Sequence, residues 1–233
     1  MVNNMKKTMT PSWDLVKPSA LLVREHFVDF MYIVLLPGLL YLLGSILLTG
    51  ALQDTSNNVK LVFGTRELIG LIVIAIAGIW SLINLGPMTY FELRAAAAKP
   101  ETISDYYRHG LRYTLPLVGL YILMALAIIG GLILFIIPGL FMIRRYLLAP
   151  YYLVDRKLSI FAALRKSAEE SKPVKKAIWG IIGVQVIVTF AAGALQIIPV
   201  IGIVLSQLVT YAITFILVLR YQEVQATLPK TKK

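Results

Sequence analysis

The sequence predicts an all-α membrane protein: a bundle of six transmembrane helices with amphipathic helices along its cytoplasmic face. Hydrophobic residues make up 58% of the chain and charged residues only 15%, whereas soluble domains carry about 25% charged residues. The apolar residues also gather into runs of about twenty, which is the length that crosses a bilayer core. We therefore expect lipid rather than water around most of the fold.

The distribution of positive charge predicts the topology of these spans. The net charge is +11. With the N-terminus placed inside, the only basic residues in the external loops are Lys60 and Arg66. Such segregation is typical of a protein whose Lys- and Arg-rich connections are cytoplasmic. Six spans with both termini in the cytoplasm follow from this pattern. No basic-aromatic module indicates nucleic acid as a partner, and the absence of cysteine excludes disulfides and Cys-ligated metals.

Residues 1–26 are predicted to form a cytoplasmic tail followed by an interfacial helix. No apolar core of a secretory signal follows Lys6 and Lys7, so the first span is expected to be retained. Ser12 is a candidate N-cap for the interfacial helix, and Pro18 is expected to divide that helix in two.

The membrane domain is expected over residues 27–222. Pro37 lies in the middle of the first span, where a kink is expected, and Pro138 ends the third. The six spans are predicted at residues 27–48, 68–93, 113–137, 140–154, 177–198 and 203–219, with a basic cytoplasmic tail at residues 223–233.

Two more amphipathic helices are predicted before the third and the fifth span. Thr102 and Asp105 have the spacing of a capping box, with Asp in place of the usual Glu, and Ser159 is expected to cap the second of these helices. The order amphipathic helix, span, span thus occurs three times. This order is compatible with three repeated units, although the sequence identity between them is too low to demonstrate duplication.

Arg144 and Arg145 are the candidate functional residues, because they fall inside the predicted fourth span. At about 1.5 Å per residue, Arg144 is roughly 9 Å from the break at Pro138. A charge at such depth is costly and indicates function by default. Three interpretations stay open: an internal ion pair with Asp29 or Glu92, snorkelling to the outer headgroups, or binding of an anionic headgroup or substrate. Arginine suits the last because its guanidinium donates two parallel hydrogen bonds.

No set of residues indicates catalysis or a cofactor. His26 and His109 lie in separate segments without metal-ligand spacing. Neither a nucleophile elbow nor a phosphate-binding glycine loop occurs. We therefore expect a protein that is not an enzyme and binds no metal or cofactor.

The central stretch resembles a bacterial family. The runs I-I-P-G-L, R-R-Y-L-L-A-P-Y-Y-L-V-D and S-I-F-A-A-L-R-K-S, within residues 136–167, are similar to YciC-like membrane proteins. They also resemble the membrane domain that precedes some glycerophosphoryl diester phosphodiesterases. The resemblance implies a multi-pass protein of the bacterial cytoplasmic (inner) membrane with no established activity. The catalytic barrel of those phosphodiesterases is absent, so no residue inherits its chemistry.

The sequence thus favours a non-enzymatic membrane module of uncharacterised role that binds lipid or a partner. The expected partners are membrane lipids of anionic type, and a protein partner or a second copy of the chain stays open. The alternative is a small transporter or lipid-translocating protein that uses the Arg144–Arg145 pair.

Overall fold

The computed structural model describes residues 9–48, 52–55, 58–61, 64–195, 202, 205–206, 209 and 213–227. Within these residues, three helices are long and apolar enough to cross a membrane: α3 (Thr65–Ala96), α4 (Ile103–Leu134) and α8 (Lys175–Leu195). Helix α2 (Phe27–Leu48) passes the same test as two segments bent by 44°. These helices confirm a membrane-embedded protein, and they match the first, second and fifth predicted spans closely.

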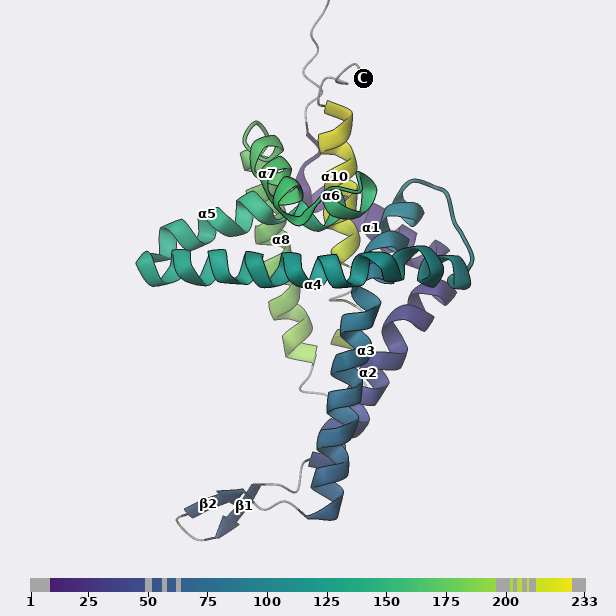
Figure 1. The fold of residues 1–233 in the computed structure, drawn as a ribbon, viewed down its shortest axis with the longest axis vertical. Helices are drawn as coiled ribbons and strands as arrows, with labels where there is room; N and C mark the ends of the chain where they lie inside the picture. The colour runs from purple at the N-terminus through teal and green to yellow at the C-terminus, as the bar shows by residue number, and fades with distance from the viewer. Residues whose placement is uncertain are drawn as a thin grey trace, which may run out of the picture.

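Helices α2 and α3 form a long hairpin (Figure 1). At its far end lies an antiparallel pair of short strands, β1 (Leu52–Thr55) and β2 (Asn58–Leu61), which the sequence analysis did not predict. Pro37 lies at the bend of α2, as expected for a residue that cannot donate a helix hydrogen bond. The two helices approach closely at glycines: a Cβ on Gly44 would lie 3.0 Å from the carbonyl oxygen of Gly70.

Helix α4 runs across α3 rather than alongside it (Figure 1). At the crossing, a Cβ on Gly86 would lie only 2.2 Å from the carbonyl oxygen of Gly110. The second predicted amphipathic helix and the third predicted span, 113–137, form one continuous helix that ends at Leu134. Its N-cap is Thr102, whose Oγ1 accepts from the amide of Asp105 at 3.4 Å. Because α3 and α4 cross, they cannot both follow the membrane normal, and the predicted six-span bundle is not confirmed.

Helix α5 (Ile136–Tyr146) folds back along α4 to make a second hairpin (Figure 1). The two helices are in close contact next to the turn at Phe135, because a Cβ on Gly131 would lie 2.9 Å from the Cα of Gly139. The tip is an apolar surface, with residues that are 67% to 80% exposed in the structure. These tip residues are Ile133, Leu134, Phe135, Ile136 and Ile137.

The structure divides the predicted fourth span, residues 140–154, into two helices. Helix α5 ends at Tyr146, and α6 (Ala149–Asp155) begins after a break. Pro150 stands in the first turn of α6, where its missing N–H leaves no helix hydrogen bond unmade. The break leaves both helices shorter than a membrane span needs, so the structure does not confirm a single fourth span.

Helix α7 (Ile160–Glu170) begins after Ser159, as predicted. The N-terminal prediction needs correction: a 3₁₀ turn η1 (Ser12–Leu15) has Pro11 as its N-cap, so Ser12 lies inside it. Pro18 does not divide α1 (Val16–Glu25), because proline is tolerated in the first turn of a helix.

The core lies where α2, α3, α4 and α10 (Thr214–Thr227) meet. Phe91 of α3 is completely buried and packs edge-on against Phe215 at 5.7 Å and Tyr106 at 5.1 Å. Such aromatic pairs add to the stabilisation from burial alone. The predicted sixth span, 203–219, falls largely outside the described residues, and only its end is seen as α10.

The charged connections lie together at one end of the molecule, and the β1–β2 pair lies at the other (Figure 1). Helices α1, α6 and α7 share the first end with the C-terminal half of α10. The segments that the charge pattern predicts to be cytoplasmic are therefore neighbours in space.

Candidate anion-binding site

The two candidate arginines lie in the last turn of α5 and have different surroundings. Arg144 is 9% exposed, and its guanidinium lies 5.4 Å from the ring centre of Phe141. Phe141 in turn packs edge-on against Trp179 of α8 at 6.4 Å. The Nε of Arg144 is buried without a hydrogen-bond partner. Arg144 therefore contributes mainly packing and a cation–π contact beside α8.

Arg145 lines a cavity of about 490 Å³ between α4, α5 and α7. Its Nε is also buried without a hydrogen-bond partner. The backbone carbonyl of Arg145 accepts a hydrogen bond from the Ser167 hydroxyl at 2.7 Å, which holds α7 against the end of α5. Because a buried unpaired polar group is unfavourable, Arg145 is the arginine in position to gain from an anionic ligand.

The cavity has an apolar wall and a cationic rim. Arg145, Arg165 and Lys172 supply the positive charges, and the single carboxylate, Glu169, lies 3.9 Å from Arg165. Phe161 is 74% exposed although it is aromatic. The apolar wall comprises Leu123 and Ala127 of α4 with Phe161, Leu164 and Ala168 of α7.

Asp29 and Glu92, the predicted ion-pair partners, do not pair with Arg144 or Arg145 in the structure. In the described part of the chain, neither Arg144 nor Arg145 forms an ion pair. Glu92 instead accepts hydrogen bonds from the Tyr151 hydroxyl at 2.9 Å and from Thr214, and Asp29 lies in the first turn of α2. The internal ion pair is thus unsupported, and Glu92 joins α3 to α6 and α10.

Arg220 is a buried residue that the sequence did not indicate, because it lies between the predicted sixth span and the predicted basic tail. Its side chain is completely buried. It donates to Glu223 at 2.5 Å, to the Thr10 carbonyl at 2.9 Å and to Ser12 Oγ at 3.0 Å. Helix α10 continues to Thr227, past residue 223, where the basic tail is predicted to begin; residues 228–233 lie outside the described residues.

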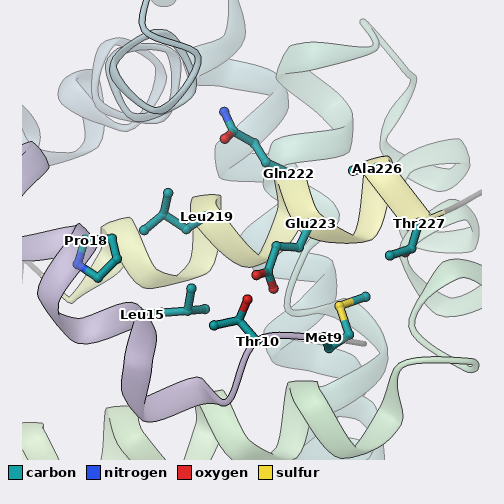
Figure 2. A pocket seen from close by; sticks show the side chains of 9 residues that line it. All are labelled: Met9, Thr10, Leu15, Pro18, Leu219, Gln222, Glu223, Ala226 and Thr227. Atoms are coloured by element: carbon teal, nitrogen blue, oxygen red, sulfur yellow. The ribbon is translucent and has the colours of Figure 1, made fainter. Parts of the chain in front are cut away.

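A second cavity, of about 540 Å³, lies between the N-terminal segment and α10. Figure 2 shows Glu223 reaching from α10 toward Thr10, with Met9 and Thr227 beside it. Glu223 is the one charged side chain in this lining, and Arg220 already pairs with it. The cavity therefore offers no unpaired charge to a ligand.

Glu170 forms a second polar cluster that joins α7 to α6 and α10. It accepts from the Tyr152 hydroxyl, from Gln225 at 3.1 Å and from Lys166 at 2.8 Å. Burial, and then the hydrogen bond to Glu170, raise the pKa of Tyr152 far above its ordinary value, so the phenol stays a donor. The Lys166–Glu170 spacing is the one signal of this cluster in the sequence.

Comparison with known proteins gives no relative: no family model, no curated protein and no solved structure matches the chain. The resemblance to YciC-like proteins therefore stays a prediction from residues 136–167.

Proposed function

We propose that this protein is a non-enzymatic membrane module that binds an anionic lipid in the cavity between α4, α5 and α7. The observation that carries the proposal is Arg145, whose buried Nε lacks a partner beside a cavity that is apolar on one wall and cationic at the rim. An anionic headgroup would supply the missing acceptor, and the apolar wall would contact the acyl chains.

The charges on the rim favour a phosphate-containing headgroup. Arg145, Arg165 and Lys172 face one carboxylate, Glu169, so the cavity attracts anions. Arginine matches phosphate oxygens with two parallel, charge-assisted hydrogen bonds. Lysine on an amphipathic segment adds attraction to the anionic leaflet as a whole.

The proposed setting is the bacterial cytoplasmic membrane, with the charged end of the molecule and both termini in the cytoplasm. The positive-inside pattern supports this orientation. The gathering of the predicted cytoplasmic segments at one end (Figure 1) is consistent with it.

The alternative, lipid translocation, would need a passage between spans. The cavity of Arg145 is lined by α4, α5 and α7 and by no residue of α3 or α8. This lining supports the lipid-binding module over the transporter.

Native mass spectrometry of the full chain in detergent, with phosphatidylglycerol or phosphatidylcholine added, tests the proposal. We expect wild type to retain phosphatidylglycerol and Arg145→Gln to bind it about tenfold more weakly, because a charge-assisted pair is lost. Arg145→Lys keeps the charge without the fork, so an intermediate retention is expected.

Arg108→Gln is the matched control, because Arg108 is an exposed arginine of α4 outside the cavity. Equal retention by Arg145→Gln and Arg108→Gln would contradict the proposal. Should Arg145→Gln fold poorly, Arg165→Gln provides the same test at a side chain that is 81% exposed.

A further inference from the structure

A separate polar cavity of about 400 Å³ lies where the α3–α4 connection meets the α6–α7 turn. It shares no lining residue with the cavity of Arg145. Four cationic side chains line it, together with His109, against two carboxylates, Glu101 and Asp155, so its net charge is +2 with the histidine neutral. The four cations are Arg94, Lys99, Arg112 and Lys157.

Both carboxylates of this cavity already have partners. Glu101 lies 3.0 Å from Arg94 and accepts a hydrogen bond from the Tyr90 hydroxyl at 3.3 Å. Asp155 accepts from the Tyr221 hydroxyl at 2.6 Å. These interactions use Arg94 but none of the other three cations.

Lys99, Arg112 and Lys157 form no ion pair with any residue that the structure describes. They come from three segments: the α3–α4 connection, α4 and the α6–α7 turn. The guanidinium of Arg112 lies 4.8 Å from the ring centre of Tyr113, another residue of the cavity. Three cations without an ion-pair partner line one cavity whose net charge is positive, and such a cavity favours an anion with more than one charge.

The backbone is strained at two places around this cavity. Among the described residues, two that are not glycine have φ in the left-handed region, Ala98 and Lys157, each at 52°. Lys157 is a lining residue, and Ala98 stands between the lining residues Ala97 and Lys99. Residues with side chains resist this conformation, and such strain concentrates at functional sites. Glycine would adopt the same turn freely, so Lys157 can be replaced by glycine without disturbing the turn.

We infer that this cavity binds the dianionic phosphate of a phosphate monoester, with Lys99, Arg112 and Lys157 as its ligands. A monoester carries about 1.5 to 2 negative charges at pH 7, which matches the net charge of +2. The fork of Arg112 contacts two phosphate oxygens, and the lysines contact the third from other sides. The phosphate belongs either to a soluble compound or to the headgroup of a lipid such as phosphatidic acid.

Two arms of one experiment distinguish the sources of the phosphate. In the first, phenyl phosphate is titrated by calorimetry into the full chain in a zwitterionic detergent, with phenyl sulfate as the monoanionic control. In the second, the chain is placed in phosphatidylcholine nanodiscs that contain phosphatidic acid or phosphatidylglycerol, and the lipid retained is measured. Preference for phenyl phosphate over phenyl sulfate identifies a soluble source, and preference for phosphatidic acid over phosphatidylglycerol identifies a lipid source.

Lys157→Gly is the decisive variant, because it removes a ligand and relieves strain together. Its melting temperature should equal or exceed that of wild type, while the affinity for the preferred phosphate should fall about tenfold, as expected for one charge-assisted contact. Ala98→Gly relieves strain without removing a charge, so it should keep the affinity. Arg112→Gln should weaken binding as Lys157→Gly does.

Arg108→Gln is the control for non-specific attraction in both arms, because Arg108 does not line this cavity. Arg145→Gln, which also lies outside this cavity, serves as a second control in the calorimetric arm only. Unchanged affinity in Lys157→Gly and Arg112→Gln would overturn the inference, as would an equal loss in Arg108→Gln. Absence of any preference for the monoester in both arms would overturn it too. Since Arg145→Gln tests the other cavity, the two proposals can fail separately.

Discussion

The crossing of α3 and α4 allows a sharp test with two identical substitutions on one helix. Gly86→Ala places a methyl group 2.2 Å from the carbonyl oxygen of Gly110 and 2.9 Å from the amide nitrogen of Thr114. Both are backbone atoms of α4, so no side-chain rotation relieves the clash. Gly78→Ala, two turns earlier on α3, meets nothing within 4 Å.

The difference between these variants isolates the crossing. Both replace a helical glycine with alanine, which stabilises a helix by roughly 0.5–1 kcal/mol, and this gain cancels in the comparison. What remains is overpacking at Gly86, which typically costs about 1–3 kcal/mol. We therefore expect Gly86→Ala to be about 1–3 kcal/mol less stable than Gly78→Ala.

Reversible unfolding by SDS in mixed micelles, followed by tryptophan fluorescence, measures this difference. Gly110→Ala should behave like Gly86→Ala, because its Cβ would lie 2.5 Å from the Cα of Pro87. The double variant should cost less than the sum of the two, since one outward shift of α4 relieves both clashes. Equal stability of Gly86→Ala and Gly78→Ala would refute the crossing at this point.

Three further predictions concern the polar contacts that join the helices. Arg220→Met should lower the free energy of unfolding by about 3 kcal/mol, because it leaves Glu223 without its buried partner. Limited proteolysis of this variant should then cut near residue 10. The control Arg24→Met, at an exposed site, should change neither the stability nor the proteolysis pattern. In wild type the free energy of unfolding should fall as pH rises above about 10. The reason is that Tyr152 keeps its proton in the folded state, whereas the same tyrosine in the unfolded chain loses its proton. In an alkaline titration, Tyr152→Phe should therefore show a smaller decrease in the free energy of unfolding than wild type. Thr102→Ala should cost about 1 kcal/mol in SDS unfolding through loss of the N-cap of α4.

Each of these has a contrary result. Protection of the N-terminal segment in Arg220→Met would show that the contact with Thr10 is not needed to hold it. An unaltered alkaline slope in Tyr152→Phe would assign that slope to other groups, and wild-type stability in Thr102→Ala would mean that water replaces the cap.

Local sequence patterns predicted the helices well, but they could not predict contacts between residues that are distant in the sequence. The apolar run of 27–48 and the cap at Thr102 are visible in the sequence, because span length and capping depend on neighbouring residues. The crossing at Gly86 and Gly110 depends on how two helices meet, which no periodicity encodes. The same limit explains the division of the predicted fourth span, where Pro150 could have marked a kink as well as a new start.

The candidate site was predicted in part. The pair Arg144–Arg145 was found from its depth in an apolar run, but the run could not show that only Arg145 lines a cavity. The burial of Arg220 was not predicted, because a cation next to a basic tail is normally a surface residue. Its burial results from contacts with residues about two hundred positions earlier in the chain.

The hydrogen bond between Arg220 and Ser12 spans 208 positions and has a consequence for biosynthesis. Ribosomes add about 5–20 residues per second, so η1 is synthesised roughly 10–40 s before its partner on α10 exists. For most of that interval Ser12 has neither Arg220 nor Ala177 to bind. The segment that is translated first is thus among the last to reach its native contacts.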